Sequence, residues 1–370
     1  MPLDNCTDDR RMKLDSQIAD RIAILRPLLI FGVVFLHVPG QVEQASALGH
    51  GWFDYFSGFF QLALFRGTVP TLTLIAGFLL FRAGLDLAPG RLYRKKARTI
   101  GIPFLVFNIA LALIAAAIDY RFDLVFMRKL VGMPARDWIN ALFGAKAVPF
   151  NYPLYFLRDL LVLVALAPLF GWILRRRPWV GMLVVALVFG CGLDGWLVRR
   201  DSSAVMFYLG GWIALAGRDL LAADRWAGPA ALLLGLLCAA LLVFRIDDNR
   251  YLVYSAPFLI WPAVSLLRGT RFWNAALRMS KYSFFVFVAH APLQELLYWG
   301  YVGLRRTLPI PYAAFWVLGP LLTIALLVAL YHGAMRVAPR AFNVLIGARA
   351  AAPRPAVPSP DEGKVLSRAG

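Results

Sequence analysis

Long apolar stretches alternate with short polar segments along almost the whole chain. Stretches of about 20 apolar residues are long enough to cross a bilayer as an α-helix. They can be distinguished at roughly residues 22–40, 55–81, 99–118, 152–174, 179–197, 203–217, 228–244, 251–267, 282–302 and 312–335. The pattern therefore predicts an all-α integral membrane protein, a bundle of about ten transmembrane helices.

The two ends of the chain differ from this pattern. Residues 1–20 are polar, and the apolar stretch after them lacks a small-residue cleavage site, so we expect a cytoplasmic N-terminal segment and not a signal peptide. Residues 21–340 would form the membrane domain. Residues 341–370, rich in Pro, Ala and Ser, are predicted to be a disordered cytoplasmic tail. The longest loop, 119–151, is a candidate cap over an outward-facing site.

Composition agrees with a membrane protein and sets its orientation. The 370 residues are 60% hydrophobic and 16% charged, with a mean hydropathy of +0.65, which excludes an ordinary soluble domain. The net charge of +18 is spread in short clusters between apolar stretches, which favours the positive-inside rule over nucleic-acid binding. Residues 82–98 hold several Lys and Arg and residues 41–54 hold none, so both termini are predicted to be cytoplasmic. The cysteines have no metal-ligand spacing, and no metal is expected.

Arg26 and His37 are the first ionisable pair inside an apolar stretch, where a charge costs several kcal/mol and therefore indicates function. Their separation is roughly 20° more than three helical turns, so they share one helix face, about 16 Å apart. That spacing suits an elongated donor with an anionic head at Arg26 and a reactive tip at His37. Alternatively, Arg26 extends to lipid phosphates and His37 bonds within the bundle. We favour His37 as a general base.

Other ionisable side chains inside apolar stretches are further candidates. Arg66 precedes Pro70, which would loosen the helix one turn later. Arg158 and Asp159 are adjacent and point about 100° apart, so they need not pair with each other. His290 lies near the middle of its stretch. Structural pairing within the bundle is the alternative for each. Two histidines are assigned to structure or solvation: His50 and His332.

Four segments resemble the bacterial membrane acyltransferase-3 family, whose members O-acylate glycans at the inner membrane. Arg26 and His37 look like the Arg-x10-His signature of its first span. "VPTLTLIAGFLLF" is similar to its Pro-aromatic-Ser-Gly-Phe-Leu segment, with Ala76 in place of serine. "RKKARTIGIPFLVF" resembles its basic run before an Ile-Pro-Tyr, and "SKYSFFVFVAHAP" its Tyr-Ser-x-Tyr-Leu-x-His-Pro segment. The likeness extends over about residues 20–335 in matching order.

The resemblance implies a reaction, a location and partners. The protein would be an O-acyltransferase of the bacterial inner membrane that moves an acetyl group from cytoplasmic acetyl-CoA to a sugar hydroxyl. The acceptor would be an exopolysaccharide, another surface glycan or a lipid-linked oligosaccharide precursor. Membrane lipids and polysaccharide-assembly proteins are the other expected partners, and nucleic acid is not.

The reaction class that the resemblance implies gives the buried ionisable residues individual roles. His37 would be the catalytic base, or alternatively a transient acyl carrier, and Arg66 or Arg158 would stabilise the developing oxyanion. One branch of the family has a glutamate where Leu160 stands here, so the neighbouring Asp159 is the substitute candidate for orienting the imidazole. The expected cofactor-binding residues hold the phosphates of CoA or line its path: Arg26, Arg94, Lys95, Lys96, Arg98 and His290. For the basic cluster, ordinary positive-inside charge is an alternative.

A different class of function uses the same buried side chains. A secondary transporter or flippase for an anionic solute or lipid-linked sugar would need buried Arg and His for binding and proton coupling. The sequence shows no internal repeat, which weakens this alternative. A transporter would also not consume acetyl-CoA.

Overall fold

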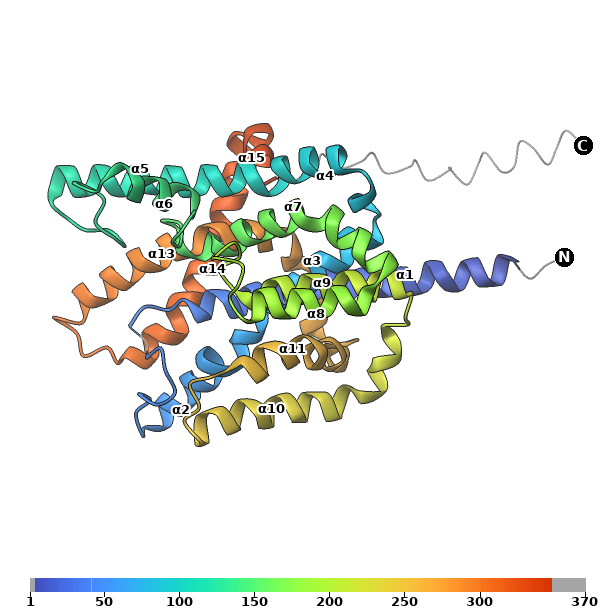
Figure 1. The fold of residues 1–370 in the computed structure, drawn as a ribbon. Coiled ribbons are helices and arrows are strands. Elements are labelled where there is room, and N and C mark those ends of the chain that lie inside the picture. The colour runs from blue at the N-terminus through green and yellow to red at the C-terminus, as the bar shows by residue number, and fades with distance from the viewer. Residues whose placement is uncertain (1–3, 41, 348–370) are drawn as a thin grey trace, which may run out of the picture.

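The structure is a computed structural model that describes residues 4–40 and 42–347, and these residues form helices without a strand (Figure 1). The prediction of an all-α protein is therefore confirmed. The α-helices are α1 (Asp4–Leu36), α2 (Trp52–Gly58), α3 (Thr68–Arg82), α4 (Pro89–Lys96), α5 (Ile102–Phe122), α6 (Ala135–Phe143), α7 (Tyr155–Arg176), α8 (Pro178–Gly190), α9 (Asp201–Ala216), α10 (Ala227–Val243), α11 (Arg250–Ala263), α12 (Arg271–Met279), α13 (Ser283–Leu304), α14 (Tyr312–Val337) and α15 (Pro339–Leu345).

Short 3-10 and π segments join or extend several of these helices. They are η1 (Phe59–Ala63), η2 (Leu64–Gly67), η3 (Leu85–Leu87), η4 (Ala97–Gly101), η5 (Tyr152–Leu154), η6 (Leu221–Trp226), η7 (Val264–Leu267) and η8 (Ser280–Tyr282). Among the described residues, six continuous helical stretches are long and apolar enough to cross a membrane, which makes this a multi-pass membrane protein. They are Trp52–Arg82, Pro89–Phe122, Tyr152–Arg176, Leu221–Val243, Arg250–Leu267 and Tyr312–Val337.

The other four expected spans fall on α1, α8, α9 and α13. Helix α8 ends at Gly190, after 13 residues, and α9 has 16 residues. At a rise of 1.5 Å per residue both are shorter than the roughly 30 Å hydrocarbon core. A total of ten spans therefore stays a prediction, and so does the cytoplasmic side of the termini.

The expected span 55–81 is divided into helical pieces of different winding. A π turn at Phe59–Ala63 is followed by a 3-10 turn at Leu64–Gly67, and the regular helix resumes at Thr68. Pro70 lies in the first turn of α3, where a missing N–H costs little because the first helical N–H groups have no partner within the helix. The irregular winding thus precedes Pro70, and it includes Arg66.

Helices α3 and α9 pack closely because glycines stand at their contact. A Cβ on Gly77 would overlap the backbone carbonyl of Phe207, and one on Gly210 would overlap the carbonyl of Leu74. Such close backbone approach between membrane helices depends on small residues at the interface. The contact fixes the position of the N-terminal end of α9, which borders the site described below.

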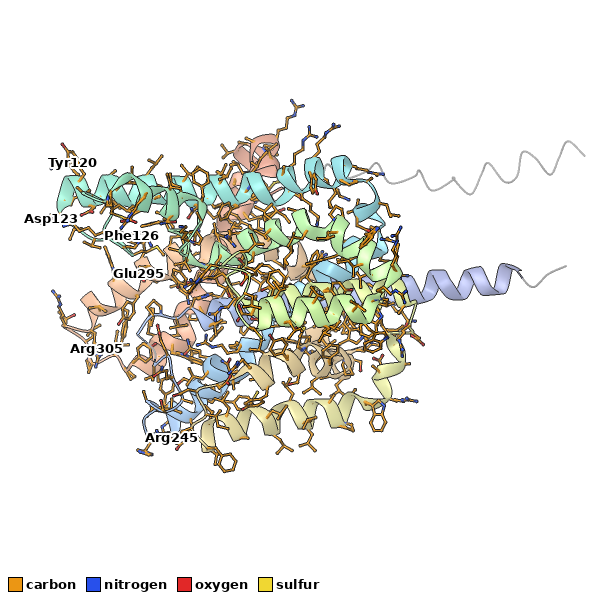
Figure 2. All side chains as sticks on the ribbon, viewed as in Figure 1. Tyr120, Asp123, Phe126, Arg245, Glu295 and Arg305 are labelled. Carbon is orange, nitrogen blue, oxygen red and sulfur yellow. The ribbon has the colours of Figure 1, made fainter. Side chains whose placement is uncertain are left out.

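The bundle has two distinct ends. The N-terminal half of α1 projects beyond one end, and α4 lies towards that end (Figure 1). At the opposite end lie the loops labelled by Tyr120, Asp123, Arg245 and Arg305 (Figure 2). The first residues of the expected tail, 341–345, belong to helix α15. Residues 348–370 lie outside the described residues, so their predicted disorder stays a prediction.

Candidate active site

His37 directly follows the last residue of α1, and its position is set by how that helix ends. The backbone N–H groups of His37 and Val38 bond the carbonyls of Val34 and Phe35 at 3.2 and 3.4 Å, which tightens the last turn. Gly40 then adopts a left-handed conformation, φ 85°, that glycine accommodates without strain. The chain therefore leaves the helix immediately after the imidazole.

Side chains from three other elements donate further hydrogen bonds to carbonyls at this helix end. Gln294 Nε2 donates to Val34 at 3.1 Å, and Gln61 Nε2 donates to Phe35 at 2.6 Å. The Tyr312 hydroxyl donates to Pro39 at 2.7 Å. Both glutamines are buried. Because buried amide groups need hydrogen-bond partners, these bonds hold the end of α1, and with it His37, in one place.

The His37 imidazole is paired with a second histidine. His37 Nδ1 lies 3.2 Å from Nε2 of His290, which is fully buried on α13. His290 Nδ1 lies 2.7 Å from the Phe287 carbonyl. A carbonyl only accepts, so His290 Nδ1 carries a proton and its Nε2 is an acceptor. His37 Nδ1 must then donate, which leaves the His37 Nε2 lone pair free.

His290 is itself held by a local interruption of α13. Pro292 has no N–H to bond the Val288 carbonyl, and Asn151 Nδ2 donates to that carbonyl at 3.0 Å instead. The backbone N–H of Asn151 in turn bonds Asn108 Oδ1 at 2.8 Å. The proline after His290 thus creates a free carbonyl, and a buried asparagine binds it.

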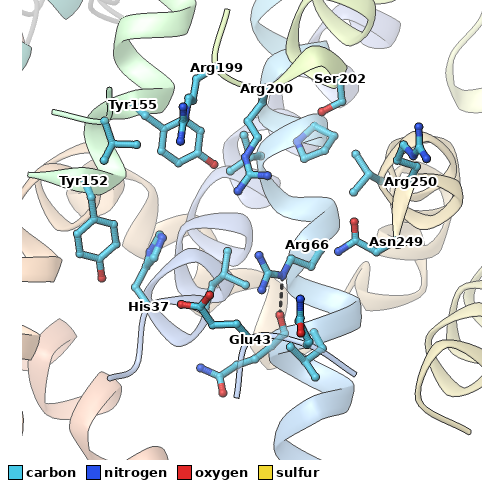
Figure 3. A pocket seen from close by; sticks show the side chains of 18 of the residues that line it. His37, Glu43, Arg66, Tyr152, Tyr155, Arg199, Arg200, Ser202, Asn249 and Arg250 are labelled. Carbon is cyan, nitrogen blue, oxygen red and sulfur yellow. Dashed lines mark hydrogen bonds between the residues drawn. The ribbon is translucent and has the colours of Figure 1, made fainter. Parts of the chain in front are cut away.

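A cavity of about 940 Å³ lies beside His37, at the ends of the helices opposite the projecting part of α1 (Figures 2 and 3). Its walls come from the loop after α1, the irregular segment before α3, the start of α7, the loop before α9, the start of α11, and Glu295 of α13. The ring of Tyr152 stands edge-on to the His37 ring, with centroids 5.1 Å apart. His37 therefore presents its free nitrogen at the wall of a space large enough for a sugar.

Two arginines from different elements enter this cavity beside His37 (Figure 3). Arg66 Nε donates to the Gln61 carbonyl at 3.1 Å, across the change from the π turn to the 3-10 turn. Arg200 precedes α9 and lies against the Tyr155 ring, 5.7 Å from its centroid. In the part of the chain that the structure describes, neither guanidinium forms an ion pair with a carboxylate.

Asp159 is fully buried, and it bonds the loop before α9 that carries Arg199 and Arg200. Its carboxylate accepts from the backbone N–H groups of Arg199 and Arg200 at 2.9 and 3.1 Å, and from Arg158 Nη1 at 3.2 Å. Arg158 also donates to the carbonyls of Gly144 and Leu197. Neither Asp159 nor Arg158 lines the main cavity. The structure thus places His290, and not Asp159, beside the imidazole, while Asp159 fixes the backbone that carries Arg200.

The expected donor-binding residues lie apart from the cavity. Arg26 is exposed on α1, and the basic cluster 94–98 stands on α4 and η4, towards the end of the bundle from which α1 projects (Figure 1). None of them lines the cavity. A donor that contacts both would have to extend along α1, as the spacing of Arg26 and His37 predicts.

The first loop after α1 forms one wall of the cavity and is attached to the loop before α11. Asp247 accepts from the backbone N–H and the hydroxyl of Ser46 at 2.9 and 2.6 Å. Arg245 Nη1 donates to the Leu48 carbonyl at 2.7 Å, and its other terminal nitrogen lies 3.1 Å from His50. The bonds from Ser46 hold the pKa of Asp247 below its ordinary value. At neutral pH this exposed carboxylate therefore connects the two loops.

The sequence alone did not identify several residues of the site. Gln61 and Gln294 interrupt apolar runs, which was a visible signal, but a search for ionisable groups passes over amides. Tyr152 and Arg200 fall in or next to polar connecting segments, where sequence patterns do not distinguish a cavity wall from a solvated loop. The last histidine, His332, lies outside the cavity, 2.7 Å from the Tyr282 hydroxyl. Within residues 4–40 and 42–347, no group of three or more His, Cys, Asp or Glu is placed to bind a metal.

Comparisons with known proteins define the class. The family model for the acyltransferase domain matches residues 20–332, most of the chain, so the protein belongs to this family, the membrane acyltransferases predicted from the motifs. Among characterised relatives, the succinoglycan biosynthesis protein ExoH of Rhizobium meliloti (strain 1021) is 32% identical over 363 residues, covering 94% of this chain and 97% of that protein. No solved structure matches the chain significantly.

Proposed function

We propose that the protein is an O-acyltransferase of the bacterial inner membrane that moves an acetyl group from cytoplasmic acetyl-CoA to a sugar hydroxyl of an exopolysaccharide or its lipid-linked precursor. Three findings support this: the acyltransferase family, the relationship to a polysaccharide biosynthesis protein, and the unprotonated nitrogen that His37 turns towards a sugar-sized cavity. The last of these carries the mechanism, because general-base chemistry requires a free lone pair next to the reacting hydroxyl.

His37 Nε2 takes the proton of the sugar hydroxyl as that oxygen attacks the thioester carbonyl. The Nδ1–H bond to His290 keeps the ring in the required tautomer and orients it. Arg66, whose Nη groups face the cavity, stabilises the negative charge that develops on the carbonyl oxygen. When the carbon–sulfur bond breaks, the CoA thiolate leaves and takes the proton from His37, which returns to its starting form.

The donor enters from the opposite end of the bundle. Its phosphates would contact Arg26 and the basic residues 94, 95, 96 and 98, and the pantetheine arm would follow α1 to His37. The acceptor sugar would enter the cavity from the loop end. In this arrangement two substrates from different sides of the membrane meet at one histidine.

The proposal is tested by proton NMR of the surface polysaccharide from cells that lack the protein and from cells re-supplied with wild type. We expect O-acetyl signals to disappear on deletion and to return with wild type. If acetyl content is the same in both strains, acetyl transfer to this glycan is excluded. Uptake of a sugar precursor into vesicles without consumption of acetyl-CoA would instead support the transporter alternative.

A further inference from the structure

The cavity contains more positive charge than the proposed general-base reaction needs. Arg66 and Arg200 come from different elements, and their guanidinium groups point into the same space (Figure 3). Like charges repel, and in a partly buried site screening by water is reduced. Two facing guanidiniums without a carboxylate partner are the arrangement that binds a carboxylate or phosphate through paired hydrogen bonds.

The surroundings support both arginines in this position. Asp159 holds the backbone of Arg200 at 3.1 Å, while the Arg200 side chain bonds the Tyr155 hydroxyl and lies over its ring, so no carboxylate is paired with this guanidinium. Arg66 uses Nε for the Gln61 carbonyl, which leaves its two Nη groups for a ligand. The N-terminal end of α9, which begins at Asp201, borders the same space and adds the partial positive charge of a helix start.

The acidic residues of the cavity do not neutralise this pair. Glu43, Asp201 and Glu295 line the wall, but no described carboxylate lies within ion-pair distance of Arg66 or Arg200. Glu295 instead accepts from the Trp299 indole at 3.1 Å. At the rim, Arg250 is already paired with Asp248 at 2.7 Å. Arg199 also lines the cavity, where it lies over the Trp196 ring at 4.9 Å, and it adds to the positive charge beside Arg66 and Arg200.

We propose that Arg66 and Arg200 form an anion-recognition subsite next to His37 that binds a carboxylate or phosphate of the substrate. The inference rests on the proposed acyltransferase function and specifies its substrates. A thioester that reaches His37 along α1 would direct its acyl chain past the imidazole into this subsite, where a terminal carboxylate of the acyl group would bind. The other source of the same chemistry is a phosphate of a lipid-linked acceptor.

The test measures ligand binding to the full-length protein in lipid nanodiscs by calorimetry. Succinyl-CoA and butyryl-CoA have acyl chains of the same carbon number, and only the first ends in a carboxylate, while inorganic pyrophosphate represents the phosphate of an acceptor. Wild type is compared with Arg66→Gln, Arg200→Gln and, as a charge-matched control, Arg250→Gln. Thermal unfolding of each variant verifies folding, and Arg200 is exposed, so its substitution leaves the core intact.

If the anion belongs to the acyl group, wild type binds succinyl-CoA about 10- to 100-fold more tightly than butyryl-CoA, the range expected for charge-assisted hydrogen bonds. If it belongs to the acceptor, the thioesters bind equally and pyrophosphate binds saturably. In either case Arg66→Gln and Arg200→Gln abolish the effect, and Arg250→Gln retains it. Equal thioester affinities without pyrophosphate binding would overturn the inference, as would Gln variants that bind like wild type.

The two proposals fail in different ways. Absence of acyl transfer from every thioester would reject the enzymatic function, while pyrophosphate binding that depends on Arg66 would still establish the anion subsite. Conversely, acyl transfer that depends on His37, together with thioester and pyrophosphate affinities that are unchanged in Arg66→Gln and Arg200→Gln, would retain the enzyme and reject the subsite.

Discussion

His290 is expected to control catalysis without touching the substrate. In the His290→Ala variant, His37 Nδ1 loses the acceptor that lies at 3.2 Å, and only the bond from the ring to the Val33 backbone remains. The ring is then held less firmly, and the reactive tautomer is less strongly favoured. Because His290 is fully buried among helix residues, the substitution also leaves a small cavity, and folding must be verified by thermal unfolding.

The size of the effect follows from the hydrogen bond that is lost. A neutral bond contributes about 0.5–1.5 kcal/mol, which corresponds to a roughly 2- to 12-fold change in the tautomer ratio. Loss of orientation adds to this, and the full contribution of general-base catalysis, about 10²- to 10⁴-fold, is the upper limit. We therefore expect kcat to fall by about 5- to 100-fold, with KM for both substrates nearly unchanged.

The assay is the initial rate of labelled acetyl transfer from acetyl-CoA to de-acetylated polysaccharide in membrane vesicles. His290→Gln places an amide oxygen near the position of the imidazole Nε2 and should restore part of the rate. His332→Ala, which removes a histidine bonded to Tyr282 outside the cavity, is the matched control. A His290→Ala variant that folds and retains the wild-type rate would refute the argument that this histidine fixes the tautomer of His37.

Three further predictions concern the fold, the donor and the loop. Gly77→Ala should destabilise the protein by about 1–3 kcal/mol, because the added Cβ overlaps the Phe207 carbonyl. The midpoint temperature of thermal unfolding should be lower than that of Gly235→Ala, whose added Cβ meets open space on α10. Equal stability of the two variants would contradict the packing argument. Arg26→Gln should raise KM for acetyl-CoA several-fold without changing KM for the polysaccharide, as measured by steady-state kinetics; a change confined to the acceptor would refute the donor route. Because its pKa is lower in the folded protein, Asp247 stabilises the loop contact above its unfolded pKa of about 3.9, and this stabilisation is lost as the pH falls through the folded value. The protection factor of the Ser46 amide, which is its exchange rate relative to the intrinsic rate at the same pH, should therefore fall at low pH in wild type and already be low at pH 7 in Asp247→Asn. A variant with the wild-type protection factor at pH 7 would refute the contact.

The helical class, which the structure confirms, and the choice of His37 as a candidate both depend on local sequence. Apolar stretches of membrane length specify helices, and an imidazole among apolar residues is costly enough to indicate function. The partner of His37 could not be derived this way. His290 lies 253 residues further along the chain, and only helix packing brings it within hydrogen-bond distance.

The partners of Asp159, the expected acidic partner of His37, could not be derived from the sequence either. Asp159 stands one residue from the position of a family glutamate, but a helix turns about 100° per residue, so a shift of one residue changes the face on which a side chain lies. In the structure Asp159 faces the loop before α9 and binds the backbone of Arg199 and Arg200. A sequence can indicate that such a carboxylate matters, but its partner depends on where a distant loop returns to the bundle.

The central claim is that His37 is the general base of acyl transfer. The most direct test is to supply purified protein in nanodiscs with acetyl-CoA labelled in the acetyl group and with de-acetylated polysaccharide, and to measure labelled ester for wild type, His37→Ala and His332→Ala. The account predicts labelled ester with wild type and His332→Ala, and a rate about 10²- to 10⁴-fold lower with His37→Ala. Transfer by His37→Ala at the wild-type rate would contradict it.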